Sequence, residues 1–234
     1  MNNQKKIQSL LKQPFITYCL IGITVIIFLA MEFSGGSENS RVLIQFGALV
    51  RPYILINKEY WRLFTPIFLH IGWMHLILNM VTLYYIGEQI ERIYGHWRYL
   101  GIYLLSGIAG NVLSFSFGSL NSISAGASTA LFGLFGAFVI LGKHFKNNPA
   151  ILEMVRQYTI FIMINLIFNL FSSSVDIMGH IGGLFGGLLL SVAFSLPKQN
   201  ETFSLRERLA AAIAFLFLLC ICFAFGLKRY GVFF

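Results

Sequence analysis

Long apolar runs separated by short polar stretches dominate this chain. Seven of them approach the length needed to cross about 30 Å of hydrocarbon, at residues 15–33, 69–87, 99–118, 128–142, 155–172, 177–196 and 208–227. Glycine and other small residues recur within the runs, as in membrane helices whose backbones pack closely. The pattern predicts an all-α fold, a polytopic bundle of about seven transmembrane helices.

Lysines at positions 5, 6 and 12 precede the first apolar run, an arrangement also found in secretory signals. The run of 19 residues exceeds the usual hydrophobic region of a signal peptide. We therefore expect it to be a retained membrane anchor.

Composition agrees with a membrane protein, since 57% of the residues are hydrophobic and only 11% are charged. If the N-terminus is cytoplasmic, eleven of the 17 Lys and Arg residues fall on cytoplasmic segments. This bias predicts a cytoplasmic N-terminus and an external C-terminus. The net charge of +8 then reflects topology and anionic lipid, and no nucleic-acid partner is expected.

Polar residues gather at one depth of the predicted bundle. In this topology the second helix carries His70, His75 and Asn79 in its outer half, the fourth begins with Ser128, and the sixth carries His180 near its outer end. Ionisable residues inside membrane helices are functional candidates by default. Their convergence predicts a site near the outer face.

The fourth run is short, because 15 residues at 1.5 Å each span only about 22 Å. Its start should therefore lie below the outer surface of the bilayer. The preceding residues 119–127 are irregular and polar, and such backbone is tolerated at membrane depth only inside protein or beside water. A water-filled pocket above Ser128 is expected.

A serine hydroxyl becomes a useful nucleophile when a base accepts its proton, and His180 is the candidate base for Ser128. His75 and Asn79 are four residues apart and share a helix face. With the backbone N–H groups at Ala127 and Ser128, they could stabilise an oxyanion.

Other hydrolase chemistries fit the sequence less well. Asp176 is the single aspartate, which excludes a two-aspartate protease, and no His-Glu-x-x-His zinc motif occurs. Asp176 could orient His180, although a loop or cap role is favoured. A zinc site of the three outer histidines is also possible but disfavoured. Ser128 alone could be a small packing residue, beside the glycines of the fourth and sixth helices.

Several segments together resemble the rhomboid intramembrane serine proteases. They are Trp61-Arg62, His70-Ile-Gly-Trp-Met-His75-Leu-Ile-Leu-Asn79, Gly87-Glu-Gln-Ile-Glu91-Arg-Ile-Tyr-Gly95, Gly126-Ala-Ser128 and Gly179-His180-Ile-Gly-Gly183, in the family's order and spacing. The similarity covers nearly the whole chain.

The resemblance implies a cytoplasmic segment at 1–14, a six-helix catalytic core at 15–196, and a linker with a seventh helix at 197–234. It implies a Ser128/His180 dyad and an oxyanion site of His75, Asn79 and the Ser128 N–H.

Supporting roles follow from the same resemblance. His70 is expected to bond backbone in the outer loop, Trp61 and Arg62 to anchor that loop, and Phe132 to pack on the catalytic histidine where many relatives have tyrosine. Gly126 and Gly183 are expected to allow close packing near the site.

Two residues on the predicted inner side lie too far from Ser128 to take part in catalysis. Glu91 is expected to bond the loop that follows its helix. His96 is expected to be solvated.

The implied function is that of a serine endopeptidase that needs no cofactor or metal. Its expected substrates are the transmembrane segments of other proteins. The expected location is a plasma membrane, and the compact chain favours a bacterial one. The oligomeric state is left open. The alternative is a non-catalytic rhomboid-like scaffold or transporter. The presence of both Ser128 and His180, without an evident inverted repeat, favours the protease.

Overall fold

The computed structural model describes residues 13–145, 147, 149, 152–160, 176–197 and 203–230. The elements along these residues are α2 (Phe15–Phe33), α3 (Ser40–Phe46), β1 (Leu49–Val50), α4 (Arg51–Leu55), the 3-10 turns η1 (Tyr60–Leu63) and η2 (Thr65–Phe68), α5 (Gly72–Thr82), the π-helical turn η3 (Leu83–Gly87), α6 (Glu88–Tyr94), α7 (His96–Phe117), β2 (Ile123–Ser124), α8 (Ser128–His144), α10 (Ile177–Phe194) and α11 (Leu205–Arg229). The fold is all-α apart from the two-residue strands β1 and β2, which pair antiparallel.

Four of the described helices, α2, α7, α10 and α11, are long and apolar enough to cross a membrane. α8 is apolar but shorter, as its 15-residue run predicted. The chain is a multi-pass membrane protein. Many large hydrophobic side chains are exposed on its described helices, as suits contact with lipid acyl chains.

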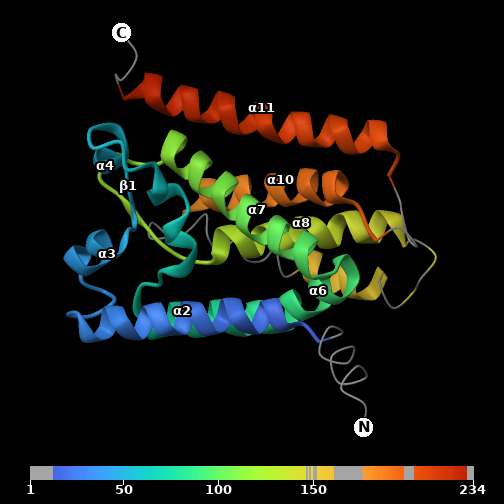
Figure 1. The fold of residues 1–234 in the computed structure, drawn as a ribbon, viewed down its shortest axis with the longest axis horizontal. Coiled ribbons are helices and arrows are strands. Elements are labelled where there is room, and N and C mark those ends of the chain that lie inside the picture. Colours follow the sequence, from blue (N-terminus) through green and yellow to red (C-terminus); the bar gives the residue numbers. More distant parts are fainter. Residues whose placement is uncertain are drawn as a thin grey trace.

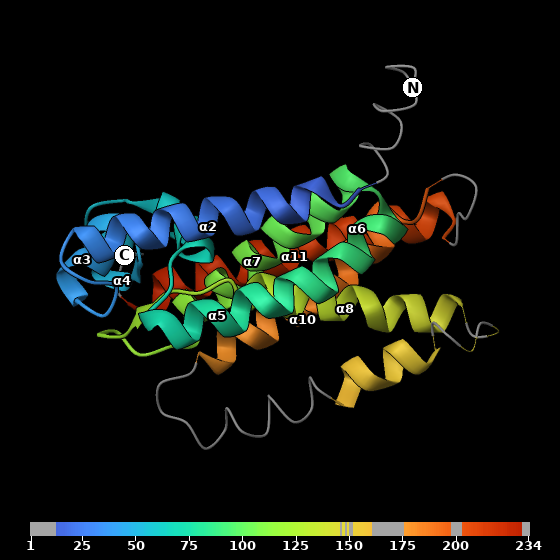
Figure 2. The ribbon, with the colours of Figure 1, turned by 90° about the horizontal axis from the view of Figure 1, so that it is seen from below.

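The centre of the bundle consists of α7, α8 and α10. α11 lies along one side of this group and α2 along the other (Figure 1). Seen from below, α5 runs beside α2, with α8 close to it (Figure 2). The principal hydrophobic core joins α2, α6, α7, α8 and α10 through buried aliphatic and aromatic side chains.

The predicted and observed helix bounds agree most closely for α2 and for the start of α8. The second predicted helix, at 69–87, is displaced: it begins at Gly72, so His70 lies just before it, and it continues through η3 and α6 to Tyr94. Gly72 has a φ of +76°, a left-handed value that glycine adopts readily, which separates the extended residues before it from the helix.

The predicted fifth helix, at 155–172, lies largely outside the described residues. Residues 152–160 are helical, so this helix begins earlier than predicted. Tyr158 packs on Phe138 with 4.6 Å between ring centroids, and its hydroxyl accepts a hydrogen bond of 3.0 Å from Gln89. The predicted cytoplasmic segment is also outside the described residues, apart from Gln13 and Pro14.

The segment between α2 and α5, which we call the outer segment after its predicted side, forms a small folded unit instead of a loop. Arg62 is almost completely buried within it and donates to the carbonyls of Ile44 (2.8 Å) and Ala48 (3.0 Å) and to Glu59 (2.6 Å). The Trp61 ring lies 4.5 Å from the Arg62 guanidinium. The two residues thus hold α3 and η1 together.

Glu91 contacts His96 just after the end of its helix, in line with its expected bond to the following loop, and it also binds the start of α2, which the sequence did not predict. Glu91 is buried and accepts hydrogen bonds from the backbone N–H groups of Ile16 (3.0 Å) and Thr17 (2.8 Å) and from the Thr17 hydroxyl (2.6 Å). His96, predicted to be solvated, is half-buried, with Nδ1 2.5 Å from Glu91. The helix start of α2 supplies unpaired N–H groups, and a buried carboxylate satisfies them.

Candidate active site

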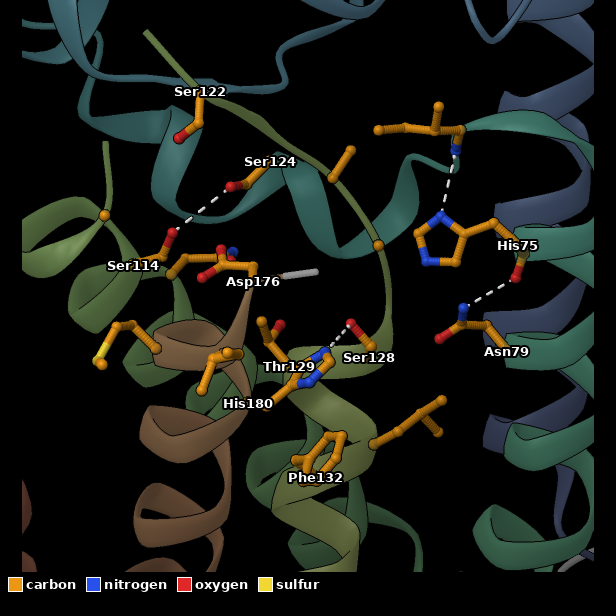
Figure 3. A pocket seen from close by; sticks show the side chains of 18 of the residues that line it. His75, Asn79, Ser114, Ser122, Ser124, Ser128, Thr129, Phe132, Asp176 and His180 are labelled. Carbon is orange, nitrogen blue, oxygen red and sulfur yellow. Dashed lines mark hydrogen bonds between the residues drawn. The ribbon is translucent and has the colours of Figure 1, made fainter. Parts of the chain in front are cut away.

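Ser128 and His180 come together where α8 and α10 begin. Ser128 is the first residue of α8, and His180 lies in the first turn of α10, where its side chain is buried. His180 Nε2 is 2.9 Å from Ser128 Oγ, a hydrogen-bond distance (Figure 3). A serine and a histidine 52 positions apart thus form a hydrogen-bonded pair inside the bundle.

The ring of Phe132 supports the imidazole of His180. The two rings stack with centroids 4.3 Å apart and an interplanar angle of 14°. Phe132 stands one helical turn after Ser128 on α8, so one helix provides both the hydroxyl and the surface on which the imidazole rests.

Glycines allow the close approach of α8 and α10. A Cβ added to Gly183 would lie 2.0 Å from the carbonyl oxygen of Thr129, and one added to Gly187 would lie 1.9 Å from that of Gly133. Both distances are far inside van der Waals contact. The helices can therefore pack at this distance only with glycine at these positions, and this packing brings His180 to Ser128.

His75 and Asn79 face Ser128 from α5 across the cavity (Figure 3). The backbone N–H of Ile71 donates to His75 Nδ1 at 3.4 Å, so the neutral imidazole carries its proton on Nε2. Asn79 Nδ2 donates to the His75 carbonyl at 2.8 Å. Nε2 of His75 is thereby a hydrogen-bond donor on the Ser128 side of α5.

The turn before Ser128 is held from two sides. The N–H of Gly126 donates to the Pro66 carbonyl at 2.9 Å, and the N–H of Ala127 donates to His70 Nε2 at 3.3 Å. Gly126 has a φ of +144°. A Cβ on Gly126 would lie 2.9 Å from His75 Nε2 and 3.5 Å from Ser128 Oγ, so the missing side chain leaves a space that both groups border.

A cavity of about 890 Å³ opens above Ser128. Its lining includes both helix starts, the α5 face and the segment 122–126, with Leu78, Phe132 and Phe135 on its apolar side. The structure thus has a cavity at the place where the sequence predicted a water-filled pocket. It is large enough for a short stretch of polypeptide with water.

Asp176 caps α10. Its Oδ1 accepts the N–H of Gly179 at 2.9 Å, while Oδ2 is buried without a hydrogen-bond partner in the described part of the chain. This arrangement corresponds to the predicted cap. Within the described ranges, His, Cys, Asp and Glu form no group of three that could hold a metal ion.

Sequence reasoning did not single out Arg51 or Thr129, which also line the cavity. Arg51 is fully buried, and Thr129 nearly so. The position of Arg51, a lone cation between the apolar segments 48–50 and 53–56, was an available signal, because a charge among apolar residues is retained only where it finds partners.

Comparison with known proteins agrees with this architecture. A family model described as "Rhomboid domain" matches residues 57–197, more than half of the chain. The chain is similar to the rhomboid protease GluP of Bacillus subtilis (strain 168), with 38% identity over 216 residues that cover 92% of this chain and 41% of the relative.

Two further relatives align over fewer residues and at lower identity. The putative rhomboid protease YdcA of the same strain is 36% identical over 62% of this chain and 72% of the relative. Rhomboid-like protease 1 of Toxoplasma gondii is 33% identical over 76% of this chain and 61% of its own length. The chain thus spans less than half of the first relative, and about two thirds of the other two. By the family match and the identity to YdcA, this chain belongs to the Rhomboid family.

Proposed function

We propose that this chain is an intramembrane serine endopeptidase that hydrolyses peptide bonds in or near the transmembrane segments of other proteins. The observation that carries the proposal is the distance of 2.9 Å between Ser128 Oγ and His180 Nε2 inside a membrane-embedded bundle. A relative that covers 92% of the chain is named a rhomboid protease, which supports the same activity.

In the proposed reaction, Ser128 Oγ attacks the carbonyl carbon of the scissile bond, and His180 Nε2 takes the hydroxyl proton. The C–N bond then breaks, and the leaving amine takes that proton from His180. Water, deprotonated by His180, then attacks the acyl ester; the bond from the acyl carbon to Ser128 Oγ breaks, Ser128 Oγ takes the proton back from His180, and the acid product leaves. Phe132 keeps the imidazole in place through both steps.

The negative charge of the tetrahedral intermediate needs donors. We assign them to His75 Nε2–H, the Asn79 amide and the Ser128 N–H, which lies in the first turn of α8, where helix N–H groups lack intrahelical partners. The Ala127 N–H can join them only if it releases its bond to His70. His70 would otherwise keep the turn before Ser128 in position.

The substrate must present an unwound backbone to this cavity, because a peptide bond inside a regular helix is protected by its own hydrogen bonds. Segments containing glycine or proline unwind most readily, and we expect them to be preferred. The proposed division is a six-helix catalytic core at 15–196 followed by a seventh helix. The Lys and Arg bias supports a cytoplasmic N-terminus and a site near the outer face of a bacterial plasma membrane.

The test is cleavage of a fluorogenic transmembrane peptide by the purified protein in detergent, together with labelling by a fluorophosphonate probe. Wild type should cleave and label, and Ser128→Ala should do neither. Ser34→Ala is the matched control, since Ser34 is exposed at the end of α2 and bonds only locally to the Ala30 carbonyl. Folded wild type that neither labels nor cleaves a panel of transmembrane peptides would instead favour a non-catalytic scaffold or transporter.

A further inference from the structure

The carboxyl end of α7 lies behind the cavity, and side chains from two distant parts of the chain bind it. The last carbonyls of a helix have no intrahelical partner. Here Arg51 donates to the carbonyls of Ser114 and Phe115, the latter at 3.0 Å. The segment after α7 is bound as well, because Arg51 also donates to the Ser119 carbonyl and to Ser122 Oγ, the latter at 2.7 Å.

The end of α11 binds two more carbonyls at this end of α7, those of Ser116 and Gly118. Arg229 Nη1 donates to the Ser116 carbonyl at 3.0 Å, and the Tyr230 hydroxyl donates to the Gly118 carbonyl at 2.9 Å. The Arg229 guanidinium lies 5.5 Å from the centre of the Tyr230 ring. In Figure 1 this end of α11 lies beside α4 and β1.

Apolar packing fixes the α11 end at this place. A hydrophobic cluster joins Leu49 and Ile54 from the outer segment, Phe115 from α7 and Leu227 from α11, with Tyr230 packed against it. A Cβ on Gly226 would come 2.6 Å from the Phe115 ring. The close contact therefore directs Arg229, which is exposed, and Tyr230, which is half-buried, toward the end of α7, where both are hydrogen-bonded.

Chain order connects this cluster to the nucleophile. Ten residues separate the end of α7 from Ser128, and Ser119, Ser122 and Gly126 among them all line the cavity. Arg51 follows β1 directly. β1 pairs with β2, and β2 lies within the segment between α7 and Ser128. The cavity wall thus starts at a turn held by Arg229 and Tyr230.

We propose that Arg229 and Tyr230 are positioning residues for the reaction, acting through the carboxyl end of α7 and the segment 119–127 on Ser128 and the cavity wall. This inference rests on the proposed protease activity. The seventh helix would then serve the site beyond its contribution to membrane anchoring, although neither side chain touches the reacting atoms.

The experiment compares Tyr230→Phe and Arg229→Gln with wild type for kcat and KM on the transmembrane peptide and for the rate of fluorophosphonate labelling. Loss of one such hydrogen bond should lower kcat and the labelling rate about 3- to 10-fold, with KM nearly unchanged. The double variant should be slower than either single variant.

Two controls make the same chemical changes elsewhere. Tyr18→Phe removes a hydroxyl that bonds Glu88 at the inner end of α2, and Lys228→Gln removes an exposed charge beside Arg229. Both should keep the wild-type kcat.

The possible outcomes separate the two proposals. An active wild type whose kcat and labelling rate are unchanged in both Tyr230→Phe and Arg229→Gln would overturn the positioning role, as would equal losses in Tyr18→Phe. An inactive, unlabelled wild type would instead refute the protease itself. If Tyr230→Phe does not fold, the comparison of Arg229→Gln with its control Lys228→Gln tests the positioning role.

Discussion

Gly183 of α10 lies against the backbone of Thr129 so closely that a Cβ would meet the Thr129 carbonyl oxygen at 2.0 Å. Thr129 directly follows Ser128 in the chain, and Gly183 is three residues after His180. It explains how two helices that start far apart in sequence hold a hydroxyl and an imidazole at hydrogen-bond distance. The geometry of the site therefore depends on a backbone contact between helices.

Gly183→Ala tests this dependence. The added methyl group must push α10 away from α8, so we expect a loss of about 1–3 kcal/mol in stability and a large loss of fluorophosphonate labelling in the protein that remains folded. Thermal unfolding in detergent and labelling measure the two effects. Gly22→Ala is the control, because nothing lies within 4 Å of a Cβ there. Equal labelling of both variants would contradict the argument.

Phe132 should contribute through its ring alone. Phe132→Leu removes the stacking on His180, which is worth about 0.5–1.5 kcal/mol for aromatic pairs, and should lower kcat by up to about 10-fold. Phe132→Tyr keeps the ring and should stay near wild type. Steady-state cleavage measures both. If the leucine variant were as fast as the tyrosine variant, the stacking would have no catalytic role.

The donors across the cavity can be tested one at a time. His75→Ala and Asn79→Ala should each lower kcat by about 10²–10³, the loss seen when one oxyanion donor is removed. KM should change little, because these donors are proposed to act on the intermediate. Single-turnover cleavage would measure the chemical step. A loss confined to KM would mean that these side chains bind substrate and do not stabilise charge.

Arg62 should contribute to the stability of the fold, because its planar guanidinium donates hydrogen bonds to several acceptors at once. Arg62→Lys cannot reach the carbonyls of Ile44 and Ala48 and the Glu59 carboxylate together, so we expect a loss of about 1–3 kcal/mol. Arg41→Lys, on the exposed side of α3, should change stability little. Thermal unfolding of the two variants gives the comparison, and equal midpoints would contradict the role of Arg62.

Glu91 offers a test away from the site. Glu91→Gln weakens charge-assisted hydrogen bonds to the start of α2 and should reduce stability by about 1.5–3 kcal/mol. Glu153→Gln, which loses an exposed pair with Arg156 and can still accept the hydrogen bond from Gln157, should cost less than about 1 kcal/mol. The kcat per folded molecule should equal that of wild type in both, and a selective loss of kcat in Glu91→Gln would show coupling to the site.

The sequence by itself determined the class of the protein, most helix spans and the positions of polar residues near the helix starts. Hydrophobic runs report directly on which segments can lie in lipid, because the cost of exposing polar groups there is large and local. The start of α8 at Ser128 and the shortness of that helix were readable for the same reason. The family motifs added roles to these positions.

Only the tertiary structure decided which side chains meet. The 2.9 Å contact of Ser128 with His180 depends on how far glycine lets α10 approach α8, and Glu91 binds the start of α2 75 positions away. The true start of the second helix depends on the left-handed Gly72. Arg51 acquires its role from carbonyls of another helix. Such contacts join residues distant in the chain, and a hydrophobic pattern, which is local, carries no information on their geometry.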